Sequence, residues 1–446
     1  MNTIREPAQT LPVLADADVC VIGGSCTGVF AAVRAARLGA SVVLLERSNA
    51  FGGVATHGLV LIWHSLRDTE FKRPIIGGLT AEVIDRLLRR DAAAINEGNS
   101  NSYCSLNTEE LKIELDGLVR EHRITPLLHT LGCRPLLQGD RIDAVLVENK
   151  DGRGAVRARV FVDATGDGDI AVRAGVPGRV RDGLQPPTTC AKIWRFHPEG
   201  KRFGDLYKAH HAAFGLEPDS GWDSPVPGLP DIRMVAQTHV FGANVADAAA
   251  LTRAEMEGRR QIRGVIDLLR AHGDPARPPV LVQLASCIGA RESRILDAAH
   301  RLTEEEVLHG IRFPDAIANG SYRVDVHAPR GGGFLFKYLD GTTLFAHNNG
   351  CEQGRWREPT PENPTFYQIP YRCLHHPSRP NLLFAGRMIS ADRGAFGAIR
   401  VMVNLNQTGE AAGTAAALAA RGGLPVGAVD PALLRRQLAD GGSIIL

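Results

Sequence analysis

The segment from Asp18 to Arg47, which reads DVCVIGGSCTGVFAAVRAARLGASVVLLER, constrains the fold more than any other part of the chain. Residues 19–22 form a short apolar run with β-branched side chains, which has the length of a buried strand. A glycine-rich turn follows, and the Ala-rich stretch 29–38 predicts a helix that Gly39 ends. Residues 41–45 predict a second apolar strand. This order of elements predicts a βαβ unit with a glycine turn after its first strand.

The glycines of this turn suit the binding of a dinucleotide. Gly23 permits a tight turn out of the strand, and Gly28 allows the helix to pack close to the sheet. The helix N-terminus then directs unpaired N–H groups and its positive dipole end at a pyrophosphate. Glu46 lies 23 residues after Gly23, where a carboxylate accepts hydrogen bonds from ribose hydroxyls. Ser25 replaces the middle glycine of the G-x-G-x-x-G pattern, so the backbone is less free to approach the phosphates.

The stretch after Glu46 favours FAD among the dinucleotides. Residues 47–56 read RSNAFGGVAT, so the pair Gly52-Gly53 follows shortly after the acidic residue. Backbone without side chains can lie against a second phosphate or against the ribitol of FAD. No second G-x-G-x-x-G opens a helix between residues 177 and 380, which argues against a separate NAD(P) domain.

Several separated blocks of the sequence resemble one family, the FAD-dependent oxidoreductases, whose flavoprotein fold is shared by fumarate reductases and glutathione reductase. These blocks are VIGGSCTG, LLERSNAFGG, IGGLTAEVIDRL, NTEELKIELDGLV, FVDATGDGDIAVRAG, SCIGARESR, IPYRCL, NLLFAGRMISADRGAFGAIRVM and GEAAGTAAALA. They run from about residue 18 to residue 420, so the resemblance covers nearly the whole chain. Each block alone is weak evidence, whereas the set is specific.

The motif and the resemblance together predict the residues that contact FAD. Arg387 stands where related flavoproteins often carry the Asp of an Ala-Gly-Asp sequence, which holds the ribitol. A helix over about 407–420 would direct its N-terminus at the flavin pyrimidine ring and stabilise negative charge there. The predicted contacts are Gly23, Gly24, Ser25, Cys26, Thr27, Gly28, Glu46, Arg47, Gly52, Gly53, Thr56, Cys133, Thr165, Gly166, Asp167, Gly386, Arg387 and Gly397.

At 446 residues the chain suits two interleaved domains. We expect an α/β protein with a Rossmann-like FAD-binding domain, an inserted β-meander and a discontinuous α+β substrate domain. The expected division is 15–175 for the first part of the FAD domain, 176–378 for the substrate domain and 379–446 for the return segment. The expected helices are 77–90, 107–122, 245–272 and 407–420, and the meander strands are 126–129, 142–148 and 155–163. Capping boxes are expected at Asn107–Glu110 and at Thr303–Glu306.

Composition and charge argue against several classes of function. The net charge is +2 and no dense run of Lys and Arg exists, so nucleic-acid binding is not supported. The eight cysteines include no C-x-x-C pair, so we expect neither an iron–sulfur cluster nor a metal site. No signal peptide and no run of 18 apolar residues is evident, so we expect a cytoplasmic protein without a membrane partner. The sequence leaves open whether copies of the chain form a homo-oligomer.

The main functional hypothesis is an FAD-dependent oxidoreductase that transfers a hydride between flavin N5 and a small polar substrate. The candidate catalytic residues are Arg387, Arg393, His57, His347 and His327, since His serves as acid or base and Arg binds carboxylates. One alternative is an FAD-dependent hydroxylase that uses NAD(P)H and O2, suggested by GDGDIAVR at 166–173. Another is an electron-transfer flavoprotein subunit. The substrate, the electron acceptor and covalent attachment of FAD through His57 or Cys26 stay open.

Overall fold

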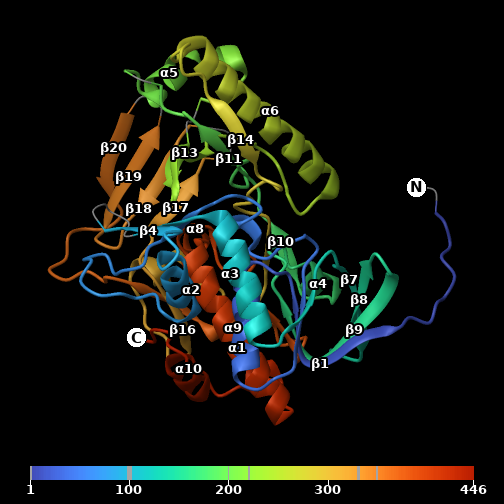
Figure 1. Cartoon of the computed structure of the whole chain (residues 1–446). Coiled ribbons are helices and arrows are strands. Elements are labelled where there is room, and N and C mark those ends of the chain that lie inside the picture. The colour runs from blue at the N-terminus through green and yellow to red at the C-terminus, as the bar shows by residue number, and fades with distance from the viewer. Residues whose placement is uncertain (1–2, 98–102, 199, 219–220, 329–331, 348–349) are drawn as a thin grey trace.

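We describe a computed structural model of the chain (Figure 1). It describes residues 3–97, 103–198, 200–218, 221–328, 332–347 and 350–446. In Figure 1 the lower part is built around α1 (Cys26–Arg37) and α9 (Met402–Gly422), and the upper part carries the long α6 (Ala248–His272). Among the described helices, none has both the length and the apolar character needed to cross a membrane.

A parallel sheet forms the centre of the lower part. β1 (Val13–Ile22) pairs in parallel with β2 (Val42–Leu45) on one side and with β9 (Gly152–Asp163) on the other. β6 (Thr125–Leu127) extends the sheet beyond β2, and β22 (Leu382–Phe384) pairs in parallel with the end of β9. The predicted βαβ unit and the Rossmann-like sheet are therefore confirmed. Because β22 joins this sheet, the chain returns to the parallel sheet after residue 380.

The meander joins the same sheet, but its first strand was predicted wrongly. β7 (Leu131–Gln138) and β8 (Arg141–Asn149) pair in antiparallel fashion, and β8 then pairs with β9. The expected strand at 126–129 instead contributes to β6, which pairs with β2. The sequence did not indicate β7 because Leu131, Leu136 and Leu137 are exposed, so the strand lacks a regular alternation of apolar and polar residues.

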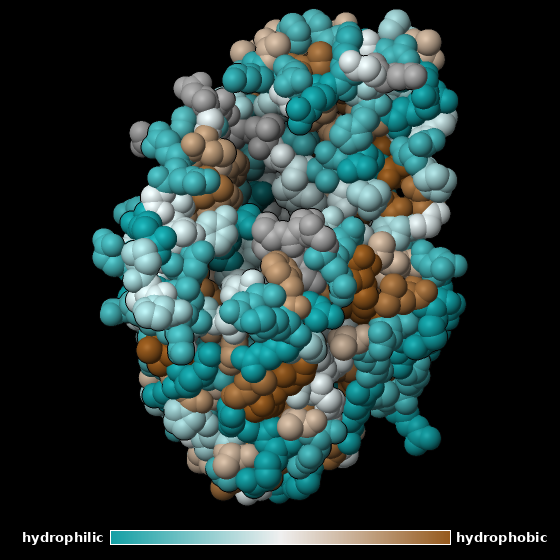
Figure 2. All heavy atoms as spheres, turned by 90° about the vertical axis from the view of Figure 1, so that its left-hand side faces the viewer, coloured by the Kyte–Doolittle hydropathy of each residue, from teal (hydrophilic) through white to brown (hydrophobic). Residues whose placement is uncertain are grey.

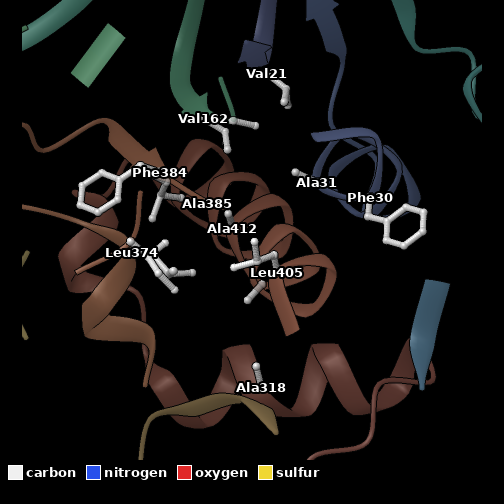
Figure 3. Close-up of a cluster of buried hydrophobic side chains, with 14 of the residues drawn as sticks. Val21, Phe30, Ala31, Val162, Ala318, Leu374, Phe384, Ala385, Leu405 and Ala412 are labelled. Atoms are coloured by element: carbon white, nitrogen blue, oxygen red, sulfur yellow. The ribbon is translucent and has the colours of Figure 1, made fainter. Parts of the chain in front are cut away.

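Two helices pack with their backbones in near contact beside the sheet. A side chain on Gly409 would begin 2.1 Å from the Thr27 carbonyl oxygen, and one on Gly413 would begin 1.9 Å from that of Ala31. Figure 3 shows Ala31 of α1 and Ala412 of α9 near Val21 and Val162 of the sheet. Glycine and alanine on α9 therefore bring the C-terminal part of the chain against the helix of the βαβ unit.

The helix at the return segment begins earlier than the sequence predicts. We expected a helix over 407–420, whereas α9 starts at Met402 and is preceded by α8 (Arg393–Ile399). Asp392 caps α8, since its side chain accepts a hydrogen bond of 2.9 Å from the Ala395 N–H. The sequence did not indicate α8 or the start of α9, because the glycine and alanine residues of this stretch give no amphipathic period.

A buried ion pair ties the two helices together. Arg34 of α1 donates from Nε and Nη2 to Glu410 Oε2 of α9, at 2.8 and 2.5 Å. Oε1 of Glu410 accepts a hydrogen bond of 3.1 Å from the backbone N–H of Leu79. The side chains of Arg34 and Glu410 are only 4% and 1% exposed. If one of them is removed, water therefore does not solvate the charge that is left on the other.

The middle region forms two antiparallel sheets in the upper part of Figure 1. The first comprises β12 (Trp222–Val226), β13 (Leu229–Ala236), β11 (Ala191–Trp194) and β14 (Val280–Leu284), in that order. Its apolar side chains pack against α5 (Phe203–His210) and α6. The second comprises β17 (Val324–His327), β18 (Phe334–Lys337), β19 (Thr342–His347) and β20 (Gly350–Arg355).

The remaining elements surround these layers. They are α2 (Gly78–Leu88), α3 (Thr108–Glu121), α4 (Asp169–Arg173), α7 (Glu304–Leu308), α10 (Pro431–Asp440), β3 (Ile62–His64), β4 (Ala93–Asn96), β5 (Tyr103–Leu106), β10 (Gly178–Val180), β15 (Arg294–Leu296), β16 (Ala316–Gly320) and β21 (Tyr367–Pro370). β16 and β21 pack into the same core as α9, so this part of 176–378 adjoins the parallel sheet. We keep the three-part division of the chain as a proposal.

The two predicted capping boxes differ in outcome. Thr303 and Glu306 form the expected reciprocal box at the start of α7. Asn107 does cap α3, but its side chain accepts from the Glu109 N–H at 3.1 Å, and the predicted return contact from Glu110 is not formed.

Neutral histidine in the core makes stability depend on pH. Burial lowers the pKa of His375 from 6.5 to about 4. The charge of Asp315 opposes this shift, and the charges of His376 and Arg372 add to it. As the pH falls through this window the unfolded chain binds a proton that the folded chain does not. We expect this histidine to reduce the free energy of unfolding by at most ~1.4 kcal/mol per pH unit.

Denaturant unfolding at several pH values between 6.5 and 4 checks this expectation. His375→Gln removes the titrating group, so its stability should fall less steeply with decreasing pH. His309→Gln, at an exposed position, should keep the slope of the unmodified protein. Equal slopes for all three proteins would contradict the assignment.

Candidate active site

A cavity of about 820 Å³ joins the parallel sheet to the two sheets of the middle region. Its volume lies within the usual range for ligand pockets, roughly 300–1,000 Å³. Figure 2, which views the molecule from the left of Figure 1, shows the surface hollowed between the upper and lower parts. The walls are the βα turn after β1, the ends of β2 and β9, the start of α9 and side chains from β17 and β18.

The glycine turn has the geometry that the motif predicts. Gly23 has a φ of +102°, and a side chain there would begin 2.4 Å from the Ala164 carbonyl oxygen. A side chain on Gly28 would begin 1.8 Å from the Gly23 carbonyl oxygen, so α1 packs directly on the turn. Ser25 caps α1 by accepting a hydrogen bond of 3.3 Å from the Gly28 N–H. The first turn of α1 carries no acidic residue, which leaves its positive dipole end available to an anion.

Glu46 stands at the end of β2 and lines the cavity. Its Oε2 accepts a hydrogen bond of 2.7 Å from the Gly24 N–H, and its Oε1 accepts one of 2.8 Å from the Ser48 N–H. These bonds fix the carboxylate beside the glycine turn. A carboxylate so placed can accept further hydrogen bonds from ribose hydroxyls, because each oxygen has a second lone pair.

Arg387 connects three separated segments at the cavity wall. Its guanidinium donates to Asp167 Oδ1, which also accepts a hydrogen bond of 2.5 Å from the Ser293 hydroxyl. A side chain on Gly166 would begin 2.5 Å from Arg387 Nη1. Nε of Arg387 is buried and makes no hydrogen bond with any residue that the structure describes. The DATGDGD block and the Ala-Gly-Arg block therefore meet at one point of the site.

A second polar group lies at the end of the cavity formed by the middle region. Asp325 Oδ2 accepts hydrogen bonds of 2.8 Å from the Tyr322 hydroxyl and 3.0 Å from Arg400 Nη2. Its Oδ1 lies 3.6 Å from His327 Nε2 and has no hydrogen bond among the described residues. All four residues line the cavity.

Burial keeps the imidazole of His327 and the hydroxyl of Tyr322 in this group neutral. The pKa of His327 lies well below 6.5, because the ring is buried and Arg291 and Arg400 repel its positive form. Burial also lowers the pKa of the neighbouring His64 to about 3 and raises that of Tyr322. At neutral pH His327 is thus an unprotonated imidazole beside a carboxylate, an arrangement suited to accepting a proton.

The structure brings most of the predicted site residues to this cavity. Those that line it are Gly23, Ser25, Cys26, Thr27, Glu46, Arg47, Gly52, Gly53, His57, Thr165, Gly166, Asp167, His327, Gly386 and Arg387. Those that do not are Gly24, Gly28, Thr56, Cys133, Arg393, Gly397 and His347. Gly24 and Gly28 shape the turn, and Gly397 packs against the backbone of Asp325. These three residues therefore support the cavity wall without lining the cavity.

Two predicted catalytic residues point elsewhere. Arg393 donates to the carbonyl oxygens of Gly183 and Asp182. His347 lies on β19 with its Nε2 3.4 Å from Glu352 Oε1. Conversely, sequence reasoning missed Tyr322, Asp325, Arg400, His64 and Arg291, which all line the cavity. Arg291 and Arg400 stand in the SCIGARESR and FGAIRVM blocks, but neither has a spacing that would have marked it as a site residue.

The fold and the cavity together define an enzyme that binds a dinucleotide on a Rossmann-like sheet. The chain belongs to the family described as FAD dependent oxidoreductase, whose family model matches residues 18–438. FAD is therefore the cofactor, and the resemblance found in the sequence is confirmed.

Comparisons with individual proteins are more distant. No curated protein matches the sequence. A geranylgeranyl bacteriochlorophyll reductase-like protein from Thermoplasma acidophilum superposes with a TM-score of 0.45 and 10% identity, over 95% of this chain and 83% of that one. The flavin-dependent brominase Bmp2 gives 0.45 and 11%, over 95% and 84%. OxyS anhydrotetracycline hydroxylase from Streptomyces rimosus gives 0.43 and 15%, over 96% and 66%.

The residues present fit FAD. The N-terminus of α1, the Glu46 carboxylate and the Gly52-Gly53 backbone line the same cavity, and they would suit the phosphates, the ribose and the ribitol, respectively. The buried Nε of Arg387 adds a donor that lacks a protein partner among the described residues. The N-terminal turn of α9, represented by Met402, Leu405 and Asn406, lines the same cavity.

We expect Gly28→Ala to purify with little or no FAD. The added methyl group would overlap the Gly23 carbonyl oxygen, so α1 must move away from the turn that faces the phosphates. FAD released by acid precipitation, expressed per mole of protein, measures the effect. Gly204→Ala is the matched control, because nothing lies within 4 Å of a side chain at that position, and it should retain full occupancy. Full occupancy in Gly28→Ala would contradict the role of this contact.

Proposed function

We propose that this enzyme transfers a hydride between N5 of FAD and a small polar substrate. The observation that supports this is the continuity of the cavity. One wall carries the dinucleotide-binding turn of β1 and α1, and the other carries the buried group His327, Asp325, Tyr322 and Arg400. A substrate in that cavity would have the cofactor on one side and a proton acceptor on the other.

His327 is assigned the role of general base or acid. A proton on Nε2, which faces Asp325 Oδ1 at 3.6 Å, leaves Nδ1 as the acceptor for a proton from the substrate. Asp325 then steadies the imidazolium, and its other oxygen is held by Tyr322 and Arg400. FAD, when bound, supplies the hydride acceptor or donor.

Three further features support the cofactor side of the reaction. Arg387 is positioned by Asp167 and carries a free buried donor, so we assign it a contact with flavin or substrate. His57 lines the cavity with Nε2 2.8 Å from the Ala50 carbonyl oxygen, which suits a flavin contact. The N-terminus of α9 contributes its positive dipole end to the cavity and would stabilise negative charge on the flavin. We do not retain Arg393 or His347 as catalytic residues.

Anaerobic reduction of the purified holoenzyme tests the proposal. A panel of small hydroxy and amino compounds is mixed with the enzyme, and the visible absorption of the flavin is followed. We expect bleaching by at least one compound, slowed when deuterium replaces hydrogen at the carbon that is oxidised. Bleaching by NADPH alone, with O2 consumed when an aromatic compound is added, would favour a hydroxylase instead. Bleaching only by a partner protein would favour an electron-transfer subunit.

We also propose a cytoplasmic location. All eight cysteines are free in the structure, as is usual for proteins kept in a reducing compartment.

A further inference from the structure

The end of the cavity formed by the middle region is cationic. Three arginines line it, Arg291, Arg323 and Arg400, together with the carboxylate of Asp325. Arg400 is bound to this carboxylate at 3.0 Å. Arg323 stacks on aromatic rings, with its guanidinium carbon 4.1 Å from the centroid of Phe336. The carboxylate of Asp325 is therefore paired with Arg400 rather than with Arg291.

Arg291 has no carboxylate partner among the described residues. Its Nη1 donates to the Pro186 carbonyl oxygen at 2.5 Å and to the Thr188 hydroxyl, and both acceptors are neutral. Its Nε and Nη2 donate to none of the residues that the structure describes. Burial lowers the pKa of Arg291 to about 10. The charge of Arg400 adds to this effect and the charge of Asp325 opposes it, and the group remains a cation at neutral pH. A cation enclosed by protein is costly unless an anion accompanies it.

Of the other acids on the cavity wall, Glu46 is held by backbone N–H groups beside the glycine turn, and the rest are paired with arginines. Asp167 accepts from Arg387, Asp169 lies 3.6 Å from Arg294, and Glu255 lies 3.1 Å from Arg259. Asp223 is bound by Arg233. The thiol of Cys190, which is close enough to sense the charge of Arg291, is neutral because burial raises its pKa to about 12. Among the described residues, therefore, no carboxylate lies within ion-pair distance of Arg291, and Asp325, whose charge does reach it, is already paired with Arg400.

We propose that the substrate is an organic carboxylate whose carboxylate group is bound by Arg291, with its reacting carbon beside His327. This inference rests on the proposed function and names the substrate class for the same cavity. A guanidinium presents two parallel N–H donors that match the two oxygens of a carboxylate. Phe334, whose ring centroid lies 4.5 Å from that of His327, offers an apolar wall to the carbon skeleton. Arg400 and Asp325 remain paired and hold the base.

The test measures binding to the oxidised holoenzyme, without turnover. Acetate, succinate and benzoate are compared with acetamide, succinamide and benzamide, and with inorganic phosphate, by calorimetry and by the change in the visible flavin spectrum. We expect at least one carboxylate to bind more tightly than its amide. Arg291→Gln should weaken that binding at least about tenfold, because a hydrogen bond between charged groups is lost. Arg291→Lys should weaken it less, and Arg263→Gln, at an exposed site on α6, should bind as the unmodified enzyme does.

Several results would overturn the inference. Equal binding of carboxylates and amides would do so, as would unchanged carboxylate binding in Arg291→Gln. Arg291-dependent binding of phosphate but of no carboxylate would assign a phosphoryl group instead. Loss of FAD from both Arg291 variants, with carboxylate binding intact in the holoenzyme that remains, would assign Arg291 to the cofactor.

The same experiment separates this inference from the proposed function. Arg291-dependent carboxylate binding without flavin bleaching by any carboxylate compound would leave the anion site standing and remove hydride transfer from it. Bleaching by uncharged compounds at equal rates in the unmodified enzyme and Arg291→Gln would support hydride transfer and overturn the carboxylate assignment alone. FAD content and thermal unfolding of each variant show that it is folded.

Discussion

Replacing His327 by Asn is expected to lower turnover by ~10²–10⁴-fold, the usual contribution of a general acid or base. The ring is buried beside Asp325 and is neutral at neutral pH, so it accepts a proton without first losing one. Asn keeps a polar side chain of similar reach but cannot take up the proton. Single-turnover reduction of the bound flavin, measured with the substrate found by anaerobic screening, gives the rate of the affected step.

His347→Asn is the matched control for this variant. The sequence nominates both histidines, but His347 lies on β19 beside Glu352 and outside the cavity. Its variant should reduce flavin at the rate of the unmodified enzyme, and FAD content should be full in both variants. Equal rates for His327→Asn and the unmodified enzyme would remove His327 from the reaction and leave Tyr322 as the remaining proton-bearing group beside Asp325.

Replacing Glu410 by Ala is expected to destabilise the protein by about 3–5 kcal/mol, as breaking a buried ion pair does. The substitution leaves the Arg34 guanidinium enclosed between α1 and α9, with the Ser443 hydroxyl as its remaining partner. It also removes the acceptor of the Leu79 N–H. Chemical denaturation followed by circular dichroism measures the loss.

The double variant Arg34→Leu with Glu410→Leu tests the cause. Since no charge is then left buried, we expect it to be clearly more stable than Glu410→Ala, although both lose the ion pair. If the double variant were less stable than the single one, packing of the two side chains rather than their charge would dominate. Arg37→Leu, which breaks a partly exposed contact with Glu82, should cost at most about 1 kcal/mol.

Short-range sequence patterns were sufficient to predict the nucleotide-binding part of the chain. Gly28 and Glu46 are set by contacts within one βαβ unit, whereas Gly23 also approaches the Ala164 carbonyl after β9. The spacing of the three residues nevertheless reports the turn and the carboxylate directly. Helices with a regular apolar period, such as α2 and α6, were also found to within a few residues of their ends. In these cases the structure needs little information from distant parts of the chain.

Distant contacts account for what the sequence did not show. Asp325 becomes a site residue only because α8 and α9 bring Arg400 against β17, 75 positions further along the chain. Arg291 stands out because no carboxylate forms an ion pair with it among the described residues. A sequence motif does not report such an absence. β6 was misassigned because its place in the sheet depends on pairing with β2. β7 was missed because several of its apolar side chains are exposed to solvent. A resemblance that covers most of the chain located the right blocks but gave no roles to these side chains.

The close packing of α9 on α1 has a consequence for biosynthesis. The glycine turn that receives the cofactor is complete near residue 28, but the helix behind it is held by Gly409, Gly413 and Glu410. Arg34 meets its partner 376 residues later. During translation, therefore, the nascent chain carries an unsupported α1 until nearly the whole polypeptide has left the ribosome. We therefore expect FAD to bind only after α9 has been synthesised, and a chain truncated before α9 to retain little FAD.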